Sequence, residues 1–168
     1  MVLDTSAFLS GFDPLSVNDD QFTVPNVEQE IRTNTITWIR FRTAVENGKI
    51  QIRPPAEKFW NKIKTSANKV GDAFFLSETD LQLLALALEL KELGFDPLVI
   101  TDDYSIQNVA TQVEIQFASL VTYGIRRLLT WIRYCPACRK EYDADYSATK
   151  CTVCDTDLKR KPLKSRRT

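Results

Sequence analysis

Short apolar runs and longer amphipathic segments alternate through the first 125 residues of the chain. In the longer segments apolar positions recur three and four residues apart, which is the spacing of one helix face. Strands that alternate with helices indicate an α/β fold with a parallel central sheet flanked by helices. The expected helices are one opened by Pro25, then 35–46, 56–69, 78–93 and one from about 104, and the expected strands are 1–4, 22–24, 50–52 and 97–101.

The segment SETDLQLLALALELKELGF, residues 77–95, is the clearest of these helices. Ser77 suits the N-cap position, and Gly94 lies beyond the last turn. Apolar residues lie almost all the way round this helix, which predicts a mostly buried element. By contrast, residues 11–21 are polar and are expected to form a loop, and residues 119–134 are expected to form a connector.

The composition is that of a globular protein. The chain has 168 residues, of which 43% are hydrophobic and 26% charged, enough for one domain with or without a small appendage. No apolar run approaches the roughly 18 residues of a membrane span, and the start MVLDTSAF lacks a secretory pattern. We therefore expect no membrane association and a cytoplasmic, reducing location. Histidine is absent, which excludes Ser-His and Cys-His nucleophiles and leaves carboxylates or a metal for catalysis.

Charge is divided unevenly along the chain, although the net charge is zero. Residues 1–134 hold 13 Lys plus Arg against 17 Asp plus Glu, a balance of −4, and residues 135–168 hold 9 against 5, a balance of +4. The last ten residues, KRKPLKSRRT, carry six basic side chains and no acid. Such a tail is typical of contact with nucleic acid, or of a solubilising end, and charge alone favours neither.

Four cysteines form the most specific local motif. They are arranged as two CxxC pairs separated by twelve residues: Cys135, Cys138, Cys151 and Cys154. Two such knuckles can complete the four-sulfur tetrahedral shell of a structural Zn²⁺ site, which keeps no open position for catalysis. The fragment around 131–160 is too short to bury a core, so metal binding would supply its folding free energy.

Other uses of these cysteines fit the sequence less well. Two disulfides are unexpected in a reducing location, and a thioredoxin-like redox site needs only one CxxC pair. A rubredoxin-type iron or iron–sulfur site is the minor competitor. Asp155 stands where a glycine often completes the second knuckle, which would loosen the turn without removing a ligand.

Acidic residues follow two of the predicted strands. Asp4 ends the first strand, and Asp102 and Asp103 end the strand at 97–101. Carboxyl ends of parallel strands lie at one edge of a sheet, where ligands bind. Asp80, in the first turn of the long helix, and Glu30 are further candidates. Such a cluster would repel itself unless protons or a divalent cation such as Mg²⁺ or Mn²⁺ compensate its charge.

Each acid also has a purely structural explanation. Asp80 lies three residues after Ser77 and can complete a capping box. Asp4 can cap the helix after it, as can Asp102 or Asp103. Glu30 alone would be read as a solvated helix residue. The metal site is therefore a hypothesis about the constellation and not about any one acid.

The motifs taken together resemble those of PIN-domain ribonucleases. The matching segments are VLDTSAF, TVPNVEQEI, LSETDLQLLALALEL and VITDDYSIQNVA, within residues 1–111. With the CxxC pairs behind them, the chain is similar to the archaeal Nob family, which implies an endonuclease that matures the 3′ end of small-subunit ribosomal RNA. The resemblance implies a catalytic set that hydrolyses RNA with one or two divalent cations: Asp4, Glu30, Asp80, Asp102 and Asp103, with Thr5, Ser6 and Thr101 in support.

Within that set the expected Mg²⁺ or Mn²⁺ ligands are Asp4, Asp80 and Asp103, with Asp103 favoured over Asp102. The resemblance also implies precursor rRNA and the pre-ribosomal small subunit as partners, and a KH-domain assembly factor as a further one. RNA contacts are expected from basic residues of the connector and ribbon, namely Arg126, Arg127, Arg133, Arg139 and Lys140. Trp131 or Tyr134 would stack on bases, or else pack internally.

The expected organisation is a PIN-like domain at 1–125, a connector and zinc ribbon at 126–160, and a disordered basic tail at 161–168. Two other functions stay open at this point. One is a toxin-type PIN ribonuclease acting on tRNA or mRNA, which the cysteine motif disfavours. The other is a non-catalytic RNA-binding assembly factor in which the acids only cap helices.

Overall fold

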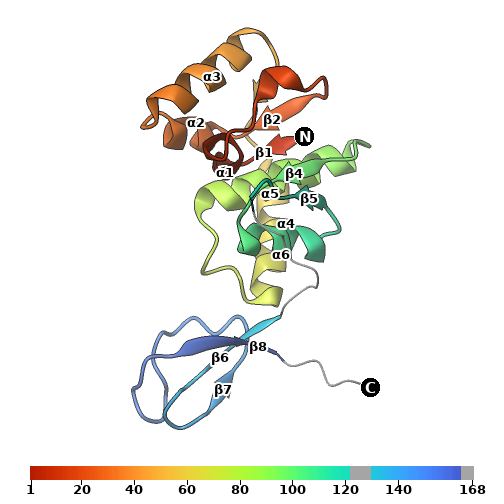
Figure 1. Ribbon diagram of the computed structural model, residues 1–168. Helices are drawn as coiled ribbons and strands as arrows, with labels where there is room; N and C mark the ends of the chain where they lie inside the picture. Colours follow the sequence, from red (N-terminus) through yellow and green to blue (C-terminus); the bar gives the residue numbers. More distant parts are fainter. Residues whose placement is uncertain (122–129, 164–168) are drawn as a thin grey trace.

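The computed structural model describes residues 1–121 and 130–163. These form two parts, an N-terminal domain of residues 1–121 and a small C-terminal ribbon of residues 130–163 (Figure 1). The part of the predicted basic tail from residue 164 onwards lies outside the described residues, as do the RNA-contact candidates Arg126 and Arg127. No helix among the described residues is long and apolar enough to cross a membrane.

A five-stranded sheet, parallel throughout, forms the centre of the N-terminal domain, in the order β3-β2-β1-β4-β5. The predicted α/β class is thus confirmed. The strands are short because both ends are bounded by polar or turn residues, and their inner residues are buried: Val2, Leu3 and Val99 are all 0% exposed. The bounds are β1 Val2–Leu3, β2 Gln21–Thr23, β3 Ile50–Ile52, β4 Leu98–Ile100 and β5 Gln116–Ala118.

Two groups of helices pack on this sheet (Figure 1). One group is α1 Thr5–Leu9, α2 Pro25–Ile31 and α3 Thr35–Glu46, and the other is α4 Glu57–Val70, α5 Glu78–Glu92 and α6 Tyr104–Gln112. Helix α5 contacts β1 and β4, and nine of its residues are buried, as its all-round apolar pattern predicts.

Two elements of the N-terminal domain are additions to the expected pattern. The first is β5, which extends the sheet beside β4 and has only three residues, one of them exposed. The second is a 3-10 turn, η1 Pro14–Ser16, inside the predicted loop. Pro14 occupies the first turn, where its missing N–H costs nothing, and Asp13 caps it.

The ribbon is a three-stranded antiparallel sheet in the order β7-β6-β8. Its strands are β6 Trp131–Tyr134, β7 Glu141–Tyr142 and β8 Lys159–Pro162. Strand β6 begins inside the predicted connector, and β8 continues two residues past the expected ribbon end at residue 160. The ribbon lies beyond the α4 and α6 side of the N-terminal domain in Figure 1.

Candidate active site and cysteine cluster

Three of the predicted acids follow neighbouring strands. Asp4 comes directly after β1, and Asp102 and Asp103 follow β4, which pairs with β1 in parallel register. The backbone N–H of Asp4 donates to the carbonyl of Ile100 at 3.2 Å, so the two strand ends are held together. The sheet therefore brings these acids to one edge, as the sequence predicts.

Asp4 is the most buried of these acids, at 6% exposed. Its Oδ1 accepts from the N–H of Thr5 at 2.7 Å, and its Oδ2 accepts from Ser6 Oγ at 2.6 Å and Thr101 Oγ1 at 2.8 Å. Burial raises the pKa of Asp4 above its usual value, and these hydrogen bonds oppose the rise only in part. An ionised Asp4 is therefore electrostatically under-compensated in the metal-free protein.

The two hydroxyl groups link Asp4 to the aspartate pair. Ser6 Oγ accepts from the backbone N–H of Asp102, and Thr101 Oγ1 accepts from the backbone N–H of Asp103, each at 3.1 Å. Each hydroxyl thus accepts from one side of the site and donates to Asp4 on the other. This network holds the carboxylate of Asp4 and the start of α6 in one arrangement.

The contacts of Asp102 and Asp103 differ. Asp102 Oδ1 accepts from the N–H groups of Leu120 and Val121 at 3.1 and 3.0 Å, and its Oδ2 accepts from Ser10 Oγ at 3.1 Å. Asp103 Oδ1 accepts from the N–H of Ser105 at 2.6 Å and so caps α6. Within residues 1–121 and 130–163, no hydrogen bond reaches the other oxygen of Asp103.

Ser10 is a site residue that the sequence motifs did not indicate. It lies 92 positions from Asp102 along the chain. No local spacing connects them, so only the fold could reveal this contact.

Asp80 completes a capping box, which was its structural explanation. Its Oδ2 accepts from the N–H of Ser77 at 2.7 Å, and Ser77 Oγ accepts from the N–H of Asp80 at 3.2 Å. Burial raises the pKa of Asp80 to about 6, and the charges of Asp4 and Asp103 make a smaller contribution in the same direction. The hydrogen bonds with Ser77 oppose this rise. The same acid therefore caps α5 and lies in the field of the acids at the strand ends.

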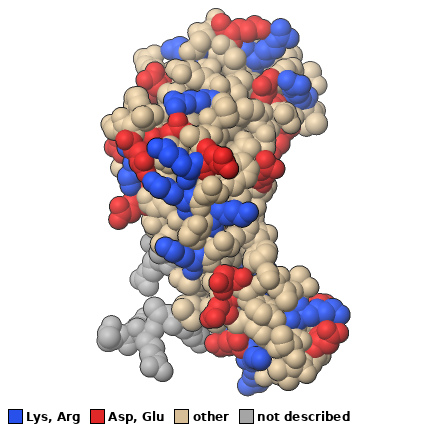
Figure 2. Space-filling view, turned by 180° about the vertical axis from the view of Figure 1, so that it is seen from behind, with Lys and Arg blue, Asp and Glu red and all other residues tan. Residues whose placement is uncertain are grey.

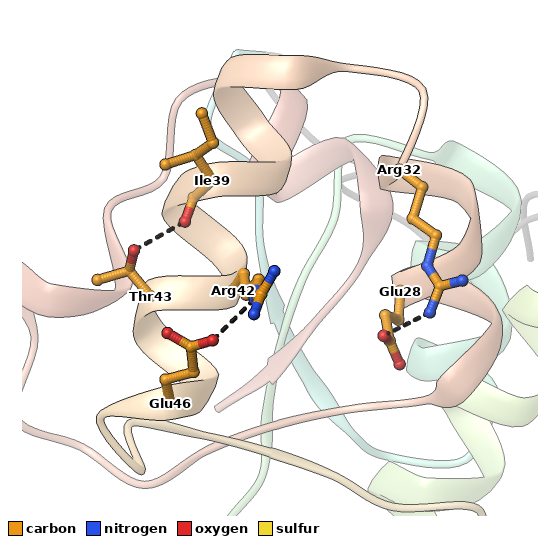
Figure 3. A network of polar contacts seen from close by, with 6 residues as sticks. All are labelled: Glu28, Arg32, Ile39, Arg42, Thr43 and Glu46. Carbon is orange, nitrogen blue, oxygen red and sulfur yellow. Dashed lines mark hydrogen bonds and ion pairs between the residues drawn. The ribbon is translucent and has the colours of Figure 1, made fainter.

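The two glutamates of α2 have different contacts. Glu30 Oε2 accepts from Thr5 Oγ1 at 2.5 Å, which connects it to the residue that follows Asp4. Glu28 instead pairs with Arg32 one turn later, at 2.9 Å (Figure 3). Figure 3 also shows the analogous pair of Arg42 and Glu46 on α3. Glu28 is thus part of a surface helix pair, and Glu30 lies beside the acidic edge.

The donor atoms at this edge suit a hard divalent cation. They are carboxylate and hydroxyl oxygens, the ligands that Mg²⁺ and Mn²⁺ prefer. Mutual repulsion contributes to the raised pKa of Asp80, and a cation would relieve it. The acids are more widely spaced than the cysteines described next, which form the one tight group of potential ligands found in residues 1–121 and 130–163. A cation here would therefore be held by few carboxylates together with water.

The four cysteines converge in the ribbon. Their sulfur atoms all lie within 4.8 Å of one another, and none is in a disulfide. Cys135 and Cys151 are buried, and Cys138 and Cys154 are exposed. A single cluster of four thiols fits one tetrahedral metal and argues against two separate disulfides. Tyr142 Oη donates to Cys151 Sγ at 3.1 Å, which orients this ligand from outside the cluster.

Asp155 takes the left-handed conformation that the knuckle requires, with φ of 54°. Glycine adopts this region without cost, and aspartate is among the few other residues that tolerate it. Its side chain accepts from Lys150 Nζ at 3.1 Å. The departure from glycine at this position is therefore compatible with both knuckles closing.

The RNA-contact candidates among the described residues differ in how exposed their side chains are. Arg139 and Lys140 are exposed, whereas Arg133 donates to the carbonyl of Ala148 at 2.9 Å and lies 4.4 Å from the ring centroid of Phe74. Trp131 packs against the N-terminal domain, and Tyr134 lies on the other face of β6. A groove along α4 is lined by Glu92 of α5 and by three lysines that the sequence did not single out, namely Lys58, Lys62 and Lys69. Figure 2 shows Lys and Arg interspersed with Asp and Glu over the face that it presents.

Comparison with known proteins agrees with this geometry. Residues 1–90 match the family described as PIN domain of ribonuclease. The chain is 34% identical to Endoribonuclease Nob1 of Methanocaldococcus jannaschii over 98% of its own length and 79% of that protein. It is 36% identical to Endoribonuclease Nob1 of Methanothermobacter thermautotrophicus, over 95% and 91% respectively. It is also 32% identical to Ribonuclease VapC1 of Thermoplasma acidophilum, over 95% and 76%.

The parallel sheet with acids at its edge and the match over residues 1–90 define a PIN-domain ribonuclease. Several relatives named Endoribonuclease Nob1 match nearly the whole chain, ribbon included, and they narrow this class. The chain belongs to the Nob1 family of endoribonucleases.

Proposed function

We propose that this endoribonuclease cleaves precursor ribosomal RNA to generate the mature 3′ end of the small-subunit rRNA, using a divalent cation at the acidic edge. The observation that carries the chemistry is the network in which Ser6 and Thr101 connect Asp4 to the backbone of Asp102 and Asp103. It fixes the buried carboxylate of Asp4, which accepts its hydrogen bonds from two hydroxyl groups and the backbone N–H of Thr5. The choice of rRNA rests on the Nob1 relatives.

Within this proposal Asp4 and Asp103 are the principal ligands of Mg²⁺ or Mn²⁺. Asp80 is a direct or water-mediated ligand, and Glu30 is a ligand or orients the attacking water. Asp102 holds the segment at Leu120 and Val121 in place, which favours Asp103 over it as ligand. When bound, the cation would activate water and stabilise charge on the leaving oxygen. The protein's own part is to fix the carboxylates, and a bound cation would favour their ionised forms.

The ribbon has a structural and RNA-binding role in this scheme. We assign Zn²⁺ to the four cysteines, since a closed four-sulfur site is what zinc prefers for structural purposes. Arg139 and Lys140 are the exposed candidates for phosphate contacts, with Arg126 and Arg127 in the connector. The division into a nuclease domain, a ribbon and a basic tail follows these roles. The pre-ribosomal small subunit and a KH-domain assembly factor are the proposed partners, in the cytoplasm.

A cleavage assay on a precursor rRNA fragment that spans the 3′ end of the small-subunit rRNA tests this function. With Mn²⁺ or Mg²⁺ we expect one major cut at the mature end. Preferential cleavage of tRNA or mRNA would instead indicate the toxin-type function. This alternative is tested because one relative is named Ribonuclease VapC1. Tight binding to the fragment without cleavage would indicate a non-catalytic assembly factor.

The two glutamates of α2 provide a matched test of the acidic edge. We expect Glu30→Gln to lower kcat on the precursor fragment by roughly 100-fold, within the range for a lost acid–base or positioning carboxylate. Glu28→Gln removes the same charge from the same helix but breaks only the pair with Arg32, so kcat should stay within about twofold. Equal loss in both variants would mean that the charge of α2, and not the contact with Thr5, matters.

A further inference from the structure

The junction between the ribbon and the N-terminal domain is built around one buried carboxylate. Asp72 follows Gly71, which ends α4, and is 1% exposed. Its Oδ2 accepts from Asn108 Nδ2 of α6 at 2.5 Å, and its Oδ1 accepts from Arg160 Nη1 of β8 at 3.1 Å. Burial raises the pKa of Asp72, and both partners oppose the rise. A buried carboxylate requires such partners, and here one of them belongs to the ribbon.

The guanidinium group of Arg160 lies against two aromatic rings. The group lies 3.6 Å from the ring centroid of Phe75 in the N-terminal domain and 4.3 Å from that of Trp131 in the ribbon. A planar guanidinium can stack on two rings while it donates to a carboxylate, which a lysine ammonium cannot do. Ion pair and stacking together define where β8 lies on the N-terminal domain.

Backbone contact at Gly71 adds a steric constraint to this junction. A Cβ atom built on Gly71 would lie 2.5 Å from the carbonyl oxygen of Trp131 and 3.0 Å from its Cβ. The φ of Gly71 is +77°, a conformation that also favours glycine. The end of α4 and the start of β6 therefore touch closely enough that only a residue without a side chain fits between them.

The ribbon has a second face that this junction leaves available. Side chains alternate along a strand, so Lys159 and Lys161 lie on the opposite face of β8 from Arg160. Lys159 is exposed and Lys161 lies 5.1 Å from the ring centroid of Tyr134 and bonds to Glu141. One face of the ribbon sheet thus docks on the protein, and the other carries basic and aromatic groups suited to RNA.

We propose that Arg160 and Asp72 are positioning residues, which hold the ribbon in one place so that RNA bound on it presents one phosphodiester to the acidic edge. The contact also reaches α6, since Asn108 lies on the helix that Asp103 caps. The consequence for cleavage rests on the proposed function, whereas the fixed docking of the ribbon does not.

Residual dipolar couplings of the zinc-loaded full chain test the docking. In wild type, the couplings of the N-terminal domain and of the ribbon should fit one alignment tensor, as expected for a fixed orientation. In Arg160→Gln the two parts should each require a tensor of their own. Lys159→Gln is the matched control, because it removes the same charge from the neighbouring position on the other face and should keep one tensor. A single shared tensor in Arg160→Gln would overturn the docking role.

Gly71→Ala provides a second variant without any change of charge. Its new Cβ should displace β6 and separate the two tensors. The control is Gly48→Ala, at a φ of +70° but with nothing within 4 Å of the added atom, so it carries the backbone strain alone. Two tensors in Gly48→Ala as well would attribute the effect to strain and contradict the steric role of the junction.

Cleavage mapping on the precursor rRNA fragment tests the consequence. Arg160→Gln should spread cuts over neighbouring phosphodiesters and lower kcat/KM at the original one by roughly 10- to 100-fold, since a misplacement of about 1 Å can cost 100-fold. A short oligonucleotide that cannot reach the ribbon should be cut at the wild-type rate. An unchanged cut pattern in a variant with two tensors would refute the positioning role. If wild type cuts no RNA, the proposed function fails, and the couplings still decide the docking.

Discussion

Replacing Asp4 with asparagine is expected to abolish cleavage of the precursor rRNA fragment, with a loss of at least roughly a thousandfold, which corresponds to about 4 kcal/mol of transition-state stabilisation. The reason is that Asp4 Oδ2 accepts from both Ser6 and Thr101, and a neutral amide in its place lacks the negative charge that attracts a divalent cation. Single-turnover cleavage with Mn²⁺, and calorimetric titration with Mn²⁺, measure the loss of activity and of metal affinity separately.

The fold should tolerate this change. Because burial raises the pKa of Asp4, its ionised form destabilises the metal-free protein at neutral pH, above its usual titration range. An asparagine removes that charge and keeps an oxygen to accept from the N–H of Thr5. Hydroxyls can donate or accept, so Ser6 and Thr101 can turn toward the new amide. The Tm of the metal-free variant should equal or exceed that of wild type.

Asp13→Asn is the matched control. Asp13 is also an N-cap, accepting from the N–H of Leu15 at 3.1 Å, but it is exposed and begins η1, in the loop before β2. Its replacement should leave cleavage within about twofold, since surface substitutions of this kind change little. Undiminished cleavage by a folded Asp4→Asn protein would place the chemistry elsewhere in the molecule.

At this site, capping a helix is compatible with the proposed binding of a cation. Asp4 caps α1, Asp80 completes the capping box of α5, and Asp103 caps α6, each through a hydrogen bond to a backbone N–H. A cap fixes the side-chain conformation of the carboxylate and places it where the positive end of the helix also lies. The structural explanation of each acid is therefore part of how the site is positioned, and finding the caps does not argue against a metal.

Sequence patterns predicted most of the N-terminal domain because its signals are local. Pro25 does open α2, and Ser77 does cap α5, since both act within one helical turn. Strand β5 escaped prediction because three residues, Gln116 to Ala118, carry too little alternation. Only pairing with β4 makes this segment a strand.

At the functional sites, too, the sequence predicts what short motifs encode and misses contacts between distant residues. Strand ends and CxxC spacing located the acids and the cysteines, because both are read from short motifs. The difference between Asp102 and Asp103 could not be read in this way, because it depends on Leu120, Val121 and Ser10. The bond from Arg160 to Asp72 joins positions 88 residues apart, and nothing near either residue indicates it.

Replacing Cys151 with serine is expected to unfold the ribbon and leave the N-terminal domain folded. Cys151 is one of the two buried ligands, and its sulfur is the one that Tyr142 contacts. The ribbon has little apolar core of its own, so we expect metal binding at the proposed zinc site to supply most of its folding free energy. Bound zinc, measured by atomic absorption, should fall from about one per chain to near zero, and RNA affinity should fall by roughly 10- to 100-fold as phosphate contacts are lost. The helical circular dichroism signal should persist.

Val153→Ser is the control for this change, because it places serine two residues away at a side chain that is 65% exposed and removes no ligand. It should keep both zinc and RNA affinity. Unfolding of the ribbon also releases Arg160, so Asp72 loses one of its two hydrogen-bond partners among the described residues and keeps Asn108. The N-terminal domain of Cys151→Ser should therefore melt at a somewhat lower temperature than in wild type, and should still bind Mn²⁺ at the acidic edge. The acids and the cysteines share no residue or hydrogen bond among those described, so we expect the two proposed metal sites to be independent. Loss of Mn²⁺ binding together with zinc in Cys151→Ser would contradict that independence.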